Sequence, residues 1–259
     1  MNYPKIVKIL NTRLEAKNTK TIFFNMKEKV LPGQFFMIWI PGIDEIPMSV
    51  SYIKKDQKSI TFRIVGDATE QLFKLGKGDK IGIRGPLGNG FKIKGKNILF
   101  IGGGTGIAML LPAIIDAYEK KIKNTVILGV KNIDELFFES EINKYSDKLI
   151  VTTDDGSKGF KGFATDIAKE LSKEDNYDSI ITCGPEIMMK KLFEIFNDKY
   201  FQASLERYMK CCMGICGQCC VGEGLRVCID GPIFDEKQLK KIDDFGKYKR
   251  DPTGKKIKI

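Results

Sequence analysis

The chain has 259 residues, of which 42% are apolar, so it can form one large domain or two ordinary ones with sizeable cores. Its formal charge is +10, yet the basic residues are spread out and no basic stripe alternates with aromatics, so we expect no nucleic acid partner. The absence of histidine excludes Rieske centres, haem with a histidine ligand, histidine-containing zinc sites and Ser-His or Cys-His nucleophiles.

The first part of the chain, residues 1–94, is predicted to be an antiparallel β-barrel. Turn formers such as Pro32-Gly33 and Gly85-Pro86 separate short runs of residues that favour strands. The predicted strands are Lys5–Leu10, Thr19–Met26, Gln34–Ile40, Ser49–Ile53, Ser59–Val65 and Lys80–Arg84. One short helix at about Thr69–Leu75 interrupts them. Several short strands at this spacing indicate a small barrel.

The pattern changes near residues 93–96, and residues 95–202 are predicted to form a doubly wound α/β domain. A buried strand at Ile98–Ile101 runs into a glycine-rich turn and then into an apolar helix that ends near Tyr118. Strand and helix then alternate at Thr125–Val130, Ile133–Glu141, Leu149–Thr153, Gly162–Leu171, Ser179–Cys183 and Glu186–Phe196. Alternation of this kind predicts a parallel sheet with helices on its faces.

Residues 203–259 are predicted to be a cysteine-rich segment followed by a basic tail. The segment is too short and too rich in glycine to bury a core of its own, so it needs a metal or a larger domain to order it. The basic run between Lys247 and Lys258 is expected to be solvated, although a basic surface also attracts anionic dinucleotides or an acidic partner.

We expect a cytoplasmic protein that does not cross a membrane. The N-terminal run MNYPKIVKIL lacks the apolar core of a signal peptide, and glycines and Pro112 interrupt the longest apolar region, Ile98–Ile115. Six of the seven cysteines fall between Cys211 and Cys228. In a cytosolic chain, such a group indicates metal ligands rather than disulfides.

Four of these cysteines have the C-x4-C-x2-C…C spacing of a plant-type [2Fe–2S] cluster: Cys211, Cys216, Cys219 and Cys228. A structural zinc site is an alternative, but it normally has two close cysteine pairs, and only Cys216 and Cys219 form one. A redox-active dithiol would need that pair alone, and inert buried cysteines are rarely so dense. The remaining two, Cys212 and Cys220, adjoin ligand candidates and are expected not to be ligands.

A second candidate site lies at the carboxyl edge of the predicted sheet. The turn Gly102-Gly103-Gly104-Thr105-Gly106 follows a strand and opens a helix, where backbone and helix N-terminus favour a pyrophosphate. Such turns are also common for packing reasons, and this run is not G-x-G-x-x-G. A second turn, Cys183-Gly184-Pro185, also lies between a strand and a helix. Two such turns at one edge mark a crevice for a ligand.

The order of a β-barrel, a GGGTGIA turn and a CGP turn resembles the ferredoxin–NADP reductase superfamily. Within it, the cysteine block resembles the electron-transfer subunits of type B dihydroorotate dehydrogenases. The matching stretches are Ser204-Leu205-Glu206-Arg207, Cys216-Gly217-Gln218-Cys219, Val227-Cys228-Ile229-Asp230-Gly231-Pro232, Gly85-Pro86-Leu87-Gly88-Asn89-Gly90-Phe91 and Asp154-Asp155-Gly156-Ser157. The resemblance covers nearly the whole chain, in order; the cysteine block and GPLGNGF are specific, whereas the glycine turn is not.

The resemblance implies that an FAD lies against the barrel. The family's Arg-Pro-x-Ser motif is matched by Pro47, Met48 and Ser49, but Ile46 stands where the arginine is expected. A second flavin-contacting strand is matched by Thr61, Phe62 and Arg63 with Gly66, and a pyrophosphate-binding helix start by Ala68 and Thr69. Arg63 is expected to supply the charge that Ile46 does not. Without the resemblance, ordinary barrel packing would explain these residues.

The resemblance also implies a function in pyrimidine biosynthesis. Dihydroorotate is oxidised on a partner subunit that contains FMN, electrons pass singly to the cluster and then to FAD, and a hydride leaves to NAD+. The expected assembly is a two-plus-two heterotetramer, and no side chain of this chain is expected to be catalytic. Two alternatives remain: the small subunit of an NADH-dependent ferredoxin:NADP oxidoreductase or of a sulfhydrogenase, and a non-catalytic zinc-binding adaptor. Lys131, which follows the second predicted strand of the sheet, leaves the choice between NAD and NADP open.

Overall fold

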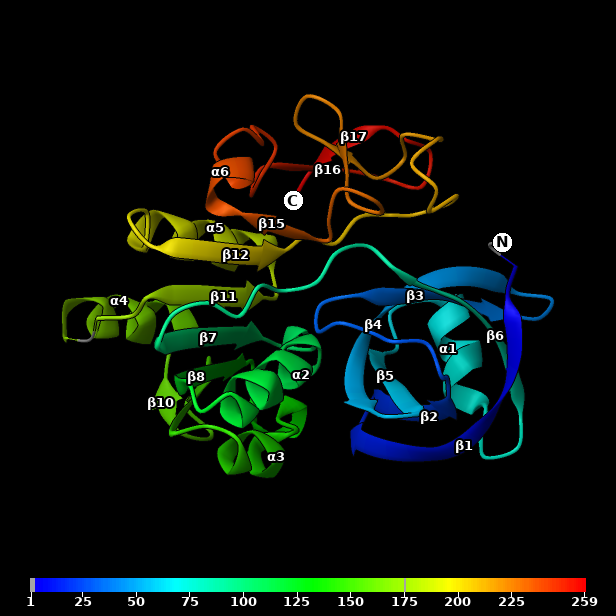
Figure 1. The fold of residues 1–259 in the computed structure, drawn as a ribbon, viewed down its shortest axis with the longest axis horizontal. Coiled ribbons are helices and arrows are strands. Elements are labelled where there is room, and N and C mark those ends of the chain that lie inside the picture. The colour runs from blue at the N-terminus through cyan, green and yellow to red at the C-terminus, as the bar shows by residue number, and fades with distance from the viewer. Residues whose placement is uncertain (1–2, 175) are drawn as a thin grey trace.

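The computed structural model describes residues 3–174 and 176–259. Figure 1 shows a β-barrel beside an α/β sheet, with the C-terminal segment, coloured orange to red, lying over both. The expected fold class is confirmed. No helix in the described residues has the length and apolar character that a membrane span requires.

The barrel is closed by six antiparallel strands in the order β1-β2-β5-β4-β3-β6. They are β1 (Lys5–Ala16), β2 (Thr19–Asn25), β3 (Phe35–Ile40), β4 (Asp44–Lys54), β5 (Gln57–Arg63) and β6 (Lys80–Leu87). Along β3, Phe36 and Ile38 point into the barrel core, whereas Phe35 and Met37 pack in a second core outside it. This alternation lets one strand serve two cores. Helix α1 (Asp67–Lys74) packs against the barrel and buries Leu72 in its core.

The sheet has seven strands in the order β10-β9-β8-β7-β11-β12-β15. They are β7 (Asn97–Gly103), β8 (Lys123–Val130), β9 (Lys148–Thr153), β10 (Phe160–Lys161), β11 (Ser179–Cys183), β12 (Tyr200–Ser204) and the antiparallel edge strand β15 (Ile233–Asp235). The helices are α2 (Gly106–Glu119), α3 (Glu139–Lys144), α4 (Ala164–Glu174) and α5 (Glu186–Ile195).

The two faces of the sheet follow from the sequence of β7. Ile98 and Phe100 pack in one core with α2, and Leu99 and Ile101 pack in the other with α4 and α5. The chain order reverses between β7 and β11, where Gly102 lies opposite Cys183. In open α/β sheets, ligands bind at such a switch point.

The C-terminal segment contains β13 (Cys220–Val221), β14 (Leu225–Arg226), β15, α6 (Glu236–Leu239) and the hairpin β16 (Tyr248–Arg250) and β17 (Lys256–Lys258). Its buried cysteines share a core with β7 and with Phe35 of the barrel. Arg84 of β6 donates to the carbonyl of Cys211 (3.0 Å), and Asn89 Nδ2 donates to the carbonyls of Asp230 (3.0 Å) and Ile233 (2.9 Å). The segment is therefore ordered by both larger parts.

The predicted helix at Ile133–Glu141 was wrong in its bounds. A 3-10 turn, η1 (Ile133–Glu135), comes first, capped by the Asn132 side chain, and α3 begins only at Glu139. Between them Phe138 adopts a left-handed conformation (φ 61°) and is buried beside Phe137. Burying two adjacent aromatic rings in the core overrides helix continuation here.

Candidate functional site

A pocket of about 360 Å³ lies between the barrel and the sheet. The barrel residues of the expected flavin site that line it are Pro47, Met48, Ser49, Thr61, Phe62, Arg63 and Thr69. From the other side the pocket is lined by Thr105, Gly106, Cys183 and the run Ser204–Arg207 with Met209. Side chains that are far apart in the sequence therefore meet in one hollow at the switch point of the sheet.

Gly66 and Ala68 do not line this pocket, but they belong to the turn that places Thr69. The amides of Val65 (2.9 Å) and Gly66 (3.1 Å) donate to Thr69 Oγ1, whose hydroxyl donates to the carbonyl of Gly66 (2.7 Å). Thr69 thus closes the start of α1 beside the pocket. Thr69, in the first turn of this eight-residue helix, lines the same pocket as Arg63.

Arg63 lies where the barrel meets the sheet domain and lines both this pocket and a larger neighbour. Its Nη1 pairs with Glu135 Oε2 at 3.2 Å. Ile46, on β4 opposite Ile38 of β3, lies outside the residues that line either pocket. Arg63 thus lines the pocket, as Arg207 does, whereas Ile46 does not.

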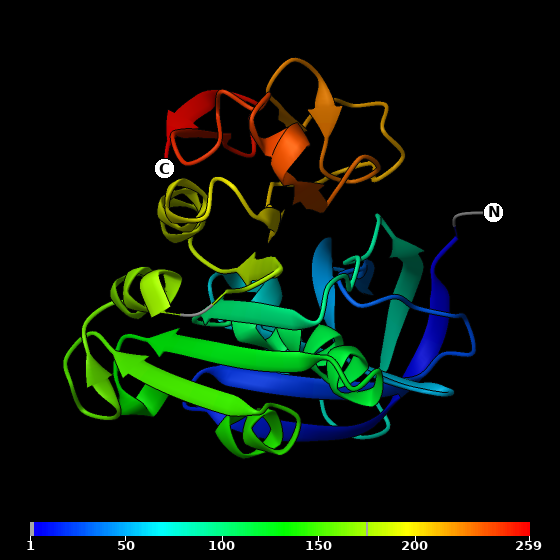
Figure 2. The ribbon, with the colours of Figure 1, turned by 60° about the vertical axis from the view of Figure 1, so that its left-hand side comes forward.

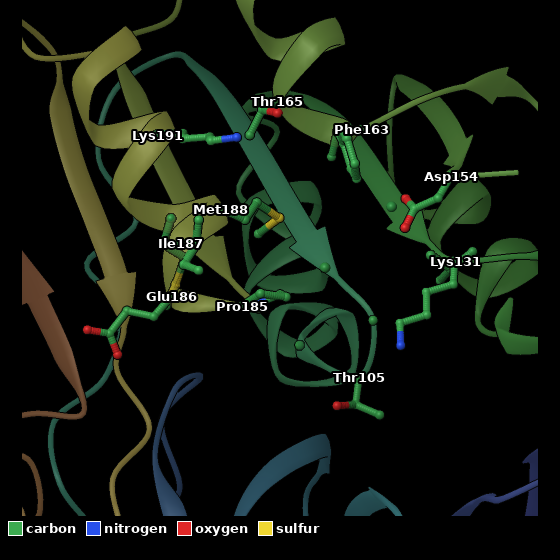
Figure 3. Close-up of a pocket in the computed structure, with 18 of the residues that line it drawn as sticks. Thr105, Lys131, Asp154, Phe163, Thr165, Pro185, Glu186, Ile187, Met188 and Lys191 are labelled. Atoms are coloured by element: carbon green, nitrogen blue, oxygen red, sulfur yellow. The ribbon is translucent and has the colours of Figure 1, made fainter. Parts of the chain in front are cut away.

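The larger pocket has a volume of about 670 Å³ and lies along the carboxyl edge of the sheet. Figure 3 shows Lys131, Asp154 and Phe163 on one side of it and Pro185, Glu186 and Met188 on the other. Thr105 lies on the glycine-rich turn between the two sides. Gly103, Gly104, Gly106 and Gly184 also line the pocket. Gly102 does not.

The glycines of the turn serve two purposes: Gly106 allows close packing, and Gly104 leaves space for a ligand. A Cβ on Gly106 would lie 2.5 Å from the carbonyl oxygen of Cys183, so the turn needs glycine there for the helix to approach β11. Gly104 has φ +54° and open space where a Cβ would point. Glycine at this position gives a left-handed turn and leaves bare backbone for a phosphate to approach.

Cys183 is buried, and its Sγ lies 3.4 Å from Met109 Sδ. Burial raises the pKa of this thiol, with the carboxylate of Glu206 acting in the same direction. A neutral thiol in this setting packs against a ligand and is a poor nucleophile.

The two pockets share part of their walls: Arg63, Thr105, Gly106 and Glu206 line both. Glu206 follows β12 and was not among the predicted site residues. The side chain of Glu206 is open to the water in the pockets, but protein atoms surround it closely enough to remove much of its solvation. This loss of solvation raises the pKa of the carboxyl, as does the nearby Glu186, whereas Lys249 and Arg207 lower the pKa. Two ligands bound in these pockets would meet at Glu206.

The four ligand candidates lie in two pairs. The amides of Met213 (3.4 Å) and Cys216 (3.5 Å) donate to Cys211 Sγ. Burial opposes ionisation of Cys211, but these amides and that of Ile215 lower the pKa of its thiol to about 6. Cys219 and Cys228 are buried together, and burial raises the pKa of the Cys219 thiol to about 12.

The two thiol pairs fit the ligand set of a cluster with two irons. Among the described residues, no three Cys, His, Asp or Glu side chains gather closely enough to hold a single metal ion. A [2Fe–2S] cluster takes two thiolates on each iron, so two separate pairs suit it. The loop that carries Cys211 also directs amides at sulfur, the hydrogen bonding that such clusters use.

Comparisons with known proteins agree with this geometry. A family model described as the iron–sulfur cluster binding domain of dihydroorotate dehydrogenase B matches residues 206–240, and an oxidoreductase NAD-binding domain matches residues 100–193. A protein of Methanocaldococcus jannaschii named probable dihydroorotate dehydrogenase B (NAD(+)), electron transfer subunit, is 46% identical over 99% of both chains. One of the same name from Pyrococcus furiosus is 43% identical over 96% of this chain and 97% of its own.

The chain belongs to the dihydroorotate dehydrogenase B electron transfer subunits. The resemblance seen in the sequence is thereby confirmed. The part that matches the iron–sulfur domain, residues 206–240, contains all four cysteine ligand candidates. The part that matches the NAD-binding domain, residues 100–193, contains both glycine turns.

Solved structures support the same architecture. An NADH-dependent reduced ferredoxin–NADP oxidoreductase structure, described in terms of flavin-based electron bifurcation, matches with a TM-score of 0.83 and 30% identity over 92% of both chains. A ferredoxin–NADP+ reductase of Neisseria gonorrhoeae with bound FAD and NADP matches with a TM-score of 0.64 and 20% identity, covering 76% of this chain and 92% of its own. The second likeness shows that the electron transfer subunit shares the reductase fold.

Proposed function

We propose that this electron transfer subunit carries electrons from dihydroorotate, oxidised on an FMN-containing partner, to NAD+. The single observation that carries the proposal is the continuity of the two pockets with the cysteine loop. The pockets meet at Glu206. Leu205, Glu206, Arg207 and Met209 line the smaller pocket, and the chain reaches Cys211 two residues after Met209. Cys212 Sγ lies 3.7 Å from Met209 Sδ, so the loop contacts the pocket wall.

The residues have distinct binding roles in this proposal. Pro47 to Ser49, Thr61 to Arg63 and the start of α1 at Ala68 and Thr69 bind FAD in the smaller pocket. The turns Gly102–Gly106 and Cys183–Pro185 bind NAD in the larger one. Cys211, Cys216, Cys219 and Cys228 bind the [2Fe–2S] cluster. When bound, the cluster supplies one-electron transfer, FAD both one-electron and hydride transfer, and NAD+ hydride acceptance.

The partner docks, in this proposal, on the exposed part of the cysteine loop. Met213 is 51% and Ile215 79% exposed, and Cys216 is exposed between them and the buried cysteines. An apolar exposed loop beside a thiolate pair suits a protein interface that must bring two redox groups close. We place one such partner on each chain, in a two-plus-two heterotetramer. The divisions at residues 1–94, 95–202 and 203–259 then correspond to FAD, NAD and cluster binding.

The test is cofactor content followed by co-purification. Anaerobically purified protein should release a flavin that chromatographs as FAD and contain about two irons and two sulfides per chain. Arg63→Ala should weaken FAD retention about fivefold because it removes the cation that faces the flavin site. Zinc without sulfide, or FMN as the only flavin, would overturn the cofactor assignment.

A second candidate is the small subunit of an NADH-dependent ferredoxin:NADP oxidoreductase, which the structural match at TM-score 0.83 favours. Affinity purification from the native cell separates the two candidates. An FMN-containing dihydroorotate dehydrogenase that co-purifies supports the first, whereas a larger flavoprotein subunit that reduces NADP+ supports the second.

A further inference from the structure

Three lysines border the larger pocket without forming an ion pair anywhere in the described part of the chain: Lys131 after β8, Lys191 on α5 and Lys249 on β16. The other basic residue of the wall, Arg63, pairs with Glu135. Unpaired cations around a pocket of this size are suited to an anionic ligand. Lys131 and Lys191 belong to the α/β domain, whereas Lys249 comes from the C-terminal segment.

Lys249 is held at the pocket by the anchoring of its hairpin. Figure 2 shows the hairpin, coloured red, over α5. The Gly246 amide donates to Glu186 Oε1 at the start of α5 (2.9 Å), and Arg207 Nη2 donates to the Tyr248 carbonyl (3.4 Å). Gln218, between two ligand candidates, donates to the Asp251 carbonyl through Nε2 (2.7 Å). The basic run is therefore a folded hairpin, fixed on both sides.

The position of Lys249 along the pocket follows from its neighbours. In Figure 3, Lys191 and Thr165 lie farther from the barrel than Lys131 and Thr105 do, whereas Glu206 lies where the two pockets join. Lys249 lies close enough to Glu206 to act on the charge of its carboxylate. It therefore belongs to the end of the pocket next to the smaller one, where the nicotinamide half of a dinucleotide would reach the flavin.

We propose that Lys249 binds the nicotinamide-side phosphate of the dinucleotide's pyrophosphate, so that the C-terminal hairpin is part of the NAD site. This inference rests on the proposed function, since it takes NAD as the ligand of the larger pocket. A pyrophosphate carries two negative charges, and the glycine turn supplies amides but no cation. Lys249 supplies a positive charge from the C-terminal segment, in addition to those that Lys131 and Lys191 of the α/β domain place at the pocket.

The test compares ligands that differ in phosphate content on the FAD- and cluster-loaded protein. Calorimetric titration with ADP-ribose, which carries the pyrophosphate, and with AMP, which carries only the adenosine-side phosphate, is made for Lys249→Gln. We expect ADP-ribose and NAD+ to bind about fivefold more weakly, AMP to bind as before, and Lys249→Arg to restore binding. Lys255→Gln is the matched control, because Lys255 is exposed on the same hairpin and does not line the pocket.

The outcomes separate this inference from the function on which it rests. If Lys249→Gln binds ADP-ribose as Lys255→Gln does, Lys249 is not a phosphate ligand, and the proposed function is untouched. If Lys249→Gln weakens the binding of AMP as much as the binding of ADP-ribose, the lysine acts through the overall electrostatic potential of the pocket or through the fold. The inference is then also overturned. If the parent protein binds neither ADP-ribose nor NAD+, the NAD assignment of the pocket fails together with the inference.

Discussion

Neighbouring cysteines in one short loop have opposite tendencies to ionise. Amides directed at sulfur lower the pKa of Cys211 to about 6 against its burial, whereas burial raises that of Cys212 to about 12. Cys212 is also held in a left-handed conformation (φ 53°) with its thiol turned into the core. The backbone thus distinguishes a thiol prepared to bind a cation from an adjacent thiol that packs.

Serine substitutions should reproduce this distinction. Cys211→Ser, Cys216→Ser, Cys219→Ser and Cys228→Ser should each abolish the visible absorption of the cluster, because each removes one of the four proposed thiolate ligands. Cys220→Ser, the matched control beside Cys219, should retain it, as should Cys212→Ser. Iron and sulfide analysis after anaerobic purification measures the result; bleaching by Cys220→Ser with retention by Cys219→Ser would reverse the assignment.

The sequence predicts the cysteine ligands, but it does not predict the place of Glu206 in the pockets. The spacing of thiol ligands is local, so a motif can specify it within eighteen residues of chain, from Cys211 to Cys228. Glu206 becomes a pocket residue only because the fold brings the end of β12 beside the turns after β7 and β11. Such a role depends on contacts distant in sequence, and no periodicity marks it.

At the scale of elements, a buried ion pair fixes the start of α5 to the chain beyond β12. Arg207 Nη2 donates to Glu186 Oε1 at 3.0 Å, and both side chains are less than a tenth exposed. The same arginine donates to the Glu206 carbonyl (2.7 Å), and the same glutamate accepts from the Gly246 amide. One pair therefore positions Glu206, the CGP turn and the hairpin.

Arg207→Met should lower the stability of the protein by about 3 kcal/mol, because it leaves the carboxylate of Glu186 buried without its cation. For a chain of this size, that corresponds to a fall in Tm of roughly 6–12 °C. Differential scanning fluorimetry of the loaded protein gives the measurement. Glu194→Gln, which removes the exposed pair with Lys190 on the same helix, is the control and should change Tm little. An equal fall in both variants would contradict the argument.

Asp178 ties the start of β7 to the start of β11, and its effect should depend on pH. Amides of Lys96 (2.6 Å) and Asn97 (3.0 Å) donate to its Oδ2 and lower its pKa. A lowered pKa in the folded state means that the stabilisation is present above the unfolded value near 4 and is lost as pH falls through the folded value.

Asp178→Asn should therefore lower Tm at pH 7, and the gap from the parent should shrink as pH falls below about 4. The measurement is Tm against pH for both proteins. Asp243→Asn, an exposed carboxylate in the C-terminal segment, should show no such gap. A gap that stays constant down to pH 3 would mean that the charge of Asp178 is not what stabilises the junction.

The sequence predicted most strands and helices of the sheet domain in the right order, because apolar residues follow a different spacing in buried strands than in amphipathic helices. It missed β10, β12 and β15, which have two, five and three residues. β10 and β15 are too short to carry a period of their own. β15 is a strand because β12 offers a free edge, a condition set by the whole sheet.

For the whole molecule, the main feature is that three parts meet at one place. α2 packs on β4 of the barrel, β3 packs its outer face against the cysteine segment, and β15 extends the sheet. The composition and periodicity of each part were visible in the sequence. Their mutual placement depends on side chains such as Arg84 and Asn89, whose partners lie more than a hundred residues away.

This placement predicts that two steps of electron transfer can be assayed separately: the step between NADH and the flavin, and the step through the cluster. The isolated chain should oxidise NADH with an artificial dye, since that reaction needs only the two pockets, and should not oxidise dihydroorotate. Addition of the FMN subunit should give transfer from dihydroorotate to NAD+. Cys216→Ser should lose at least 90% of this coupled rate and keep its NADH–dye rate. Full coupled turnover by Cys216→Ser would remove the cluster from the path.

The hydrogen bond from Gln218 to Asp251 gives the cysteine loop and the dinucleotide pocket a shared support. Gln218 lies between Cys216 and Cys219, and Asp251 follows the strand that carries Lys249. We expect a ligand that shifts this strand to act on the loop as well. By thermodynamic linkage the effect would be reciprocal: a nucleotide that favours one redox state of the bound cluster would itself bind more tightly in that state. Gln218 would then make the release of the nucleotide depend on whether the subunit is reduced or oxidised.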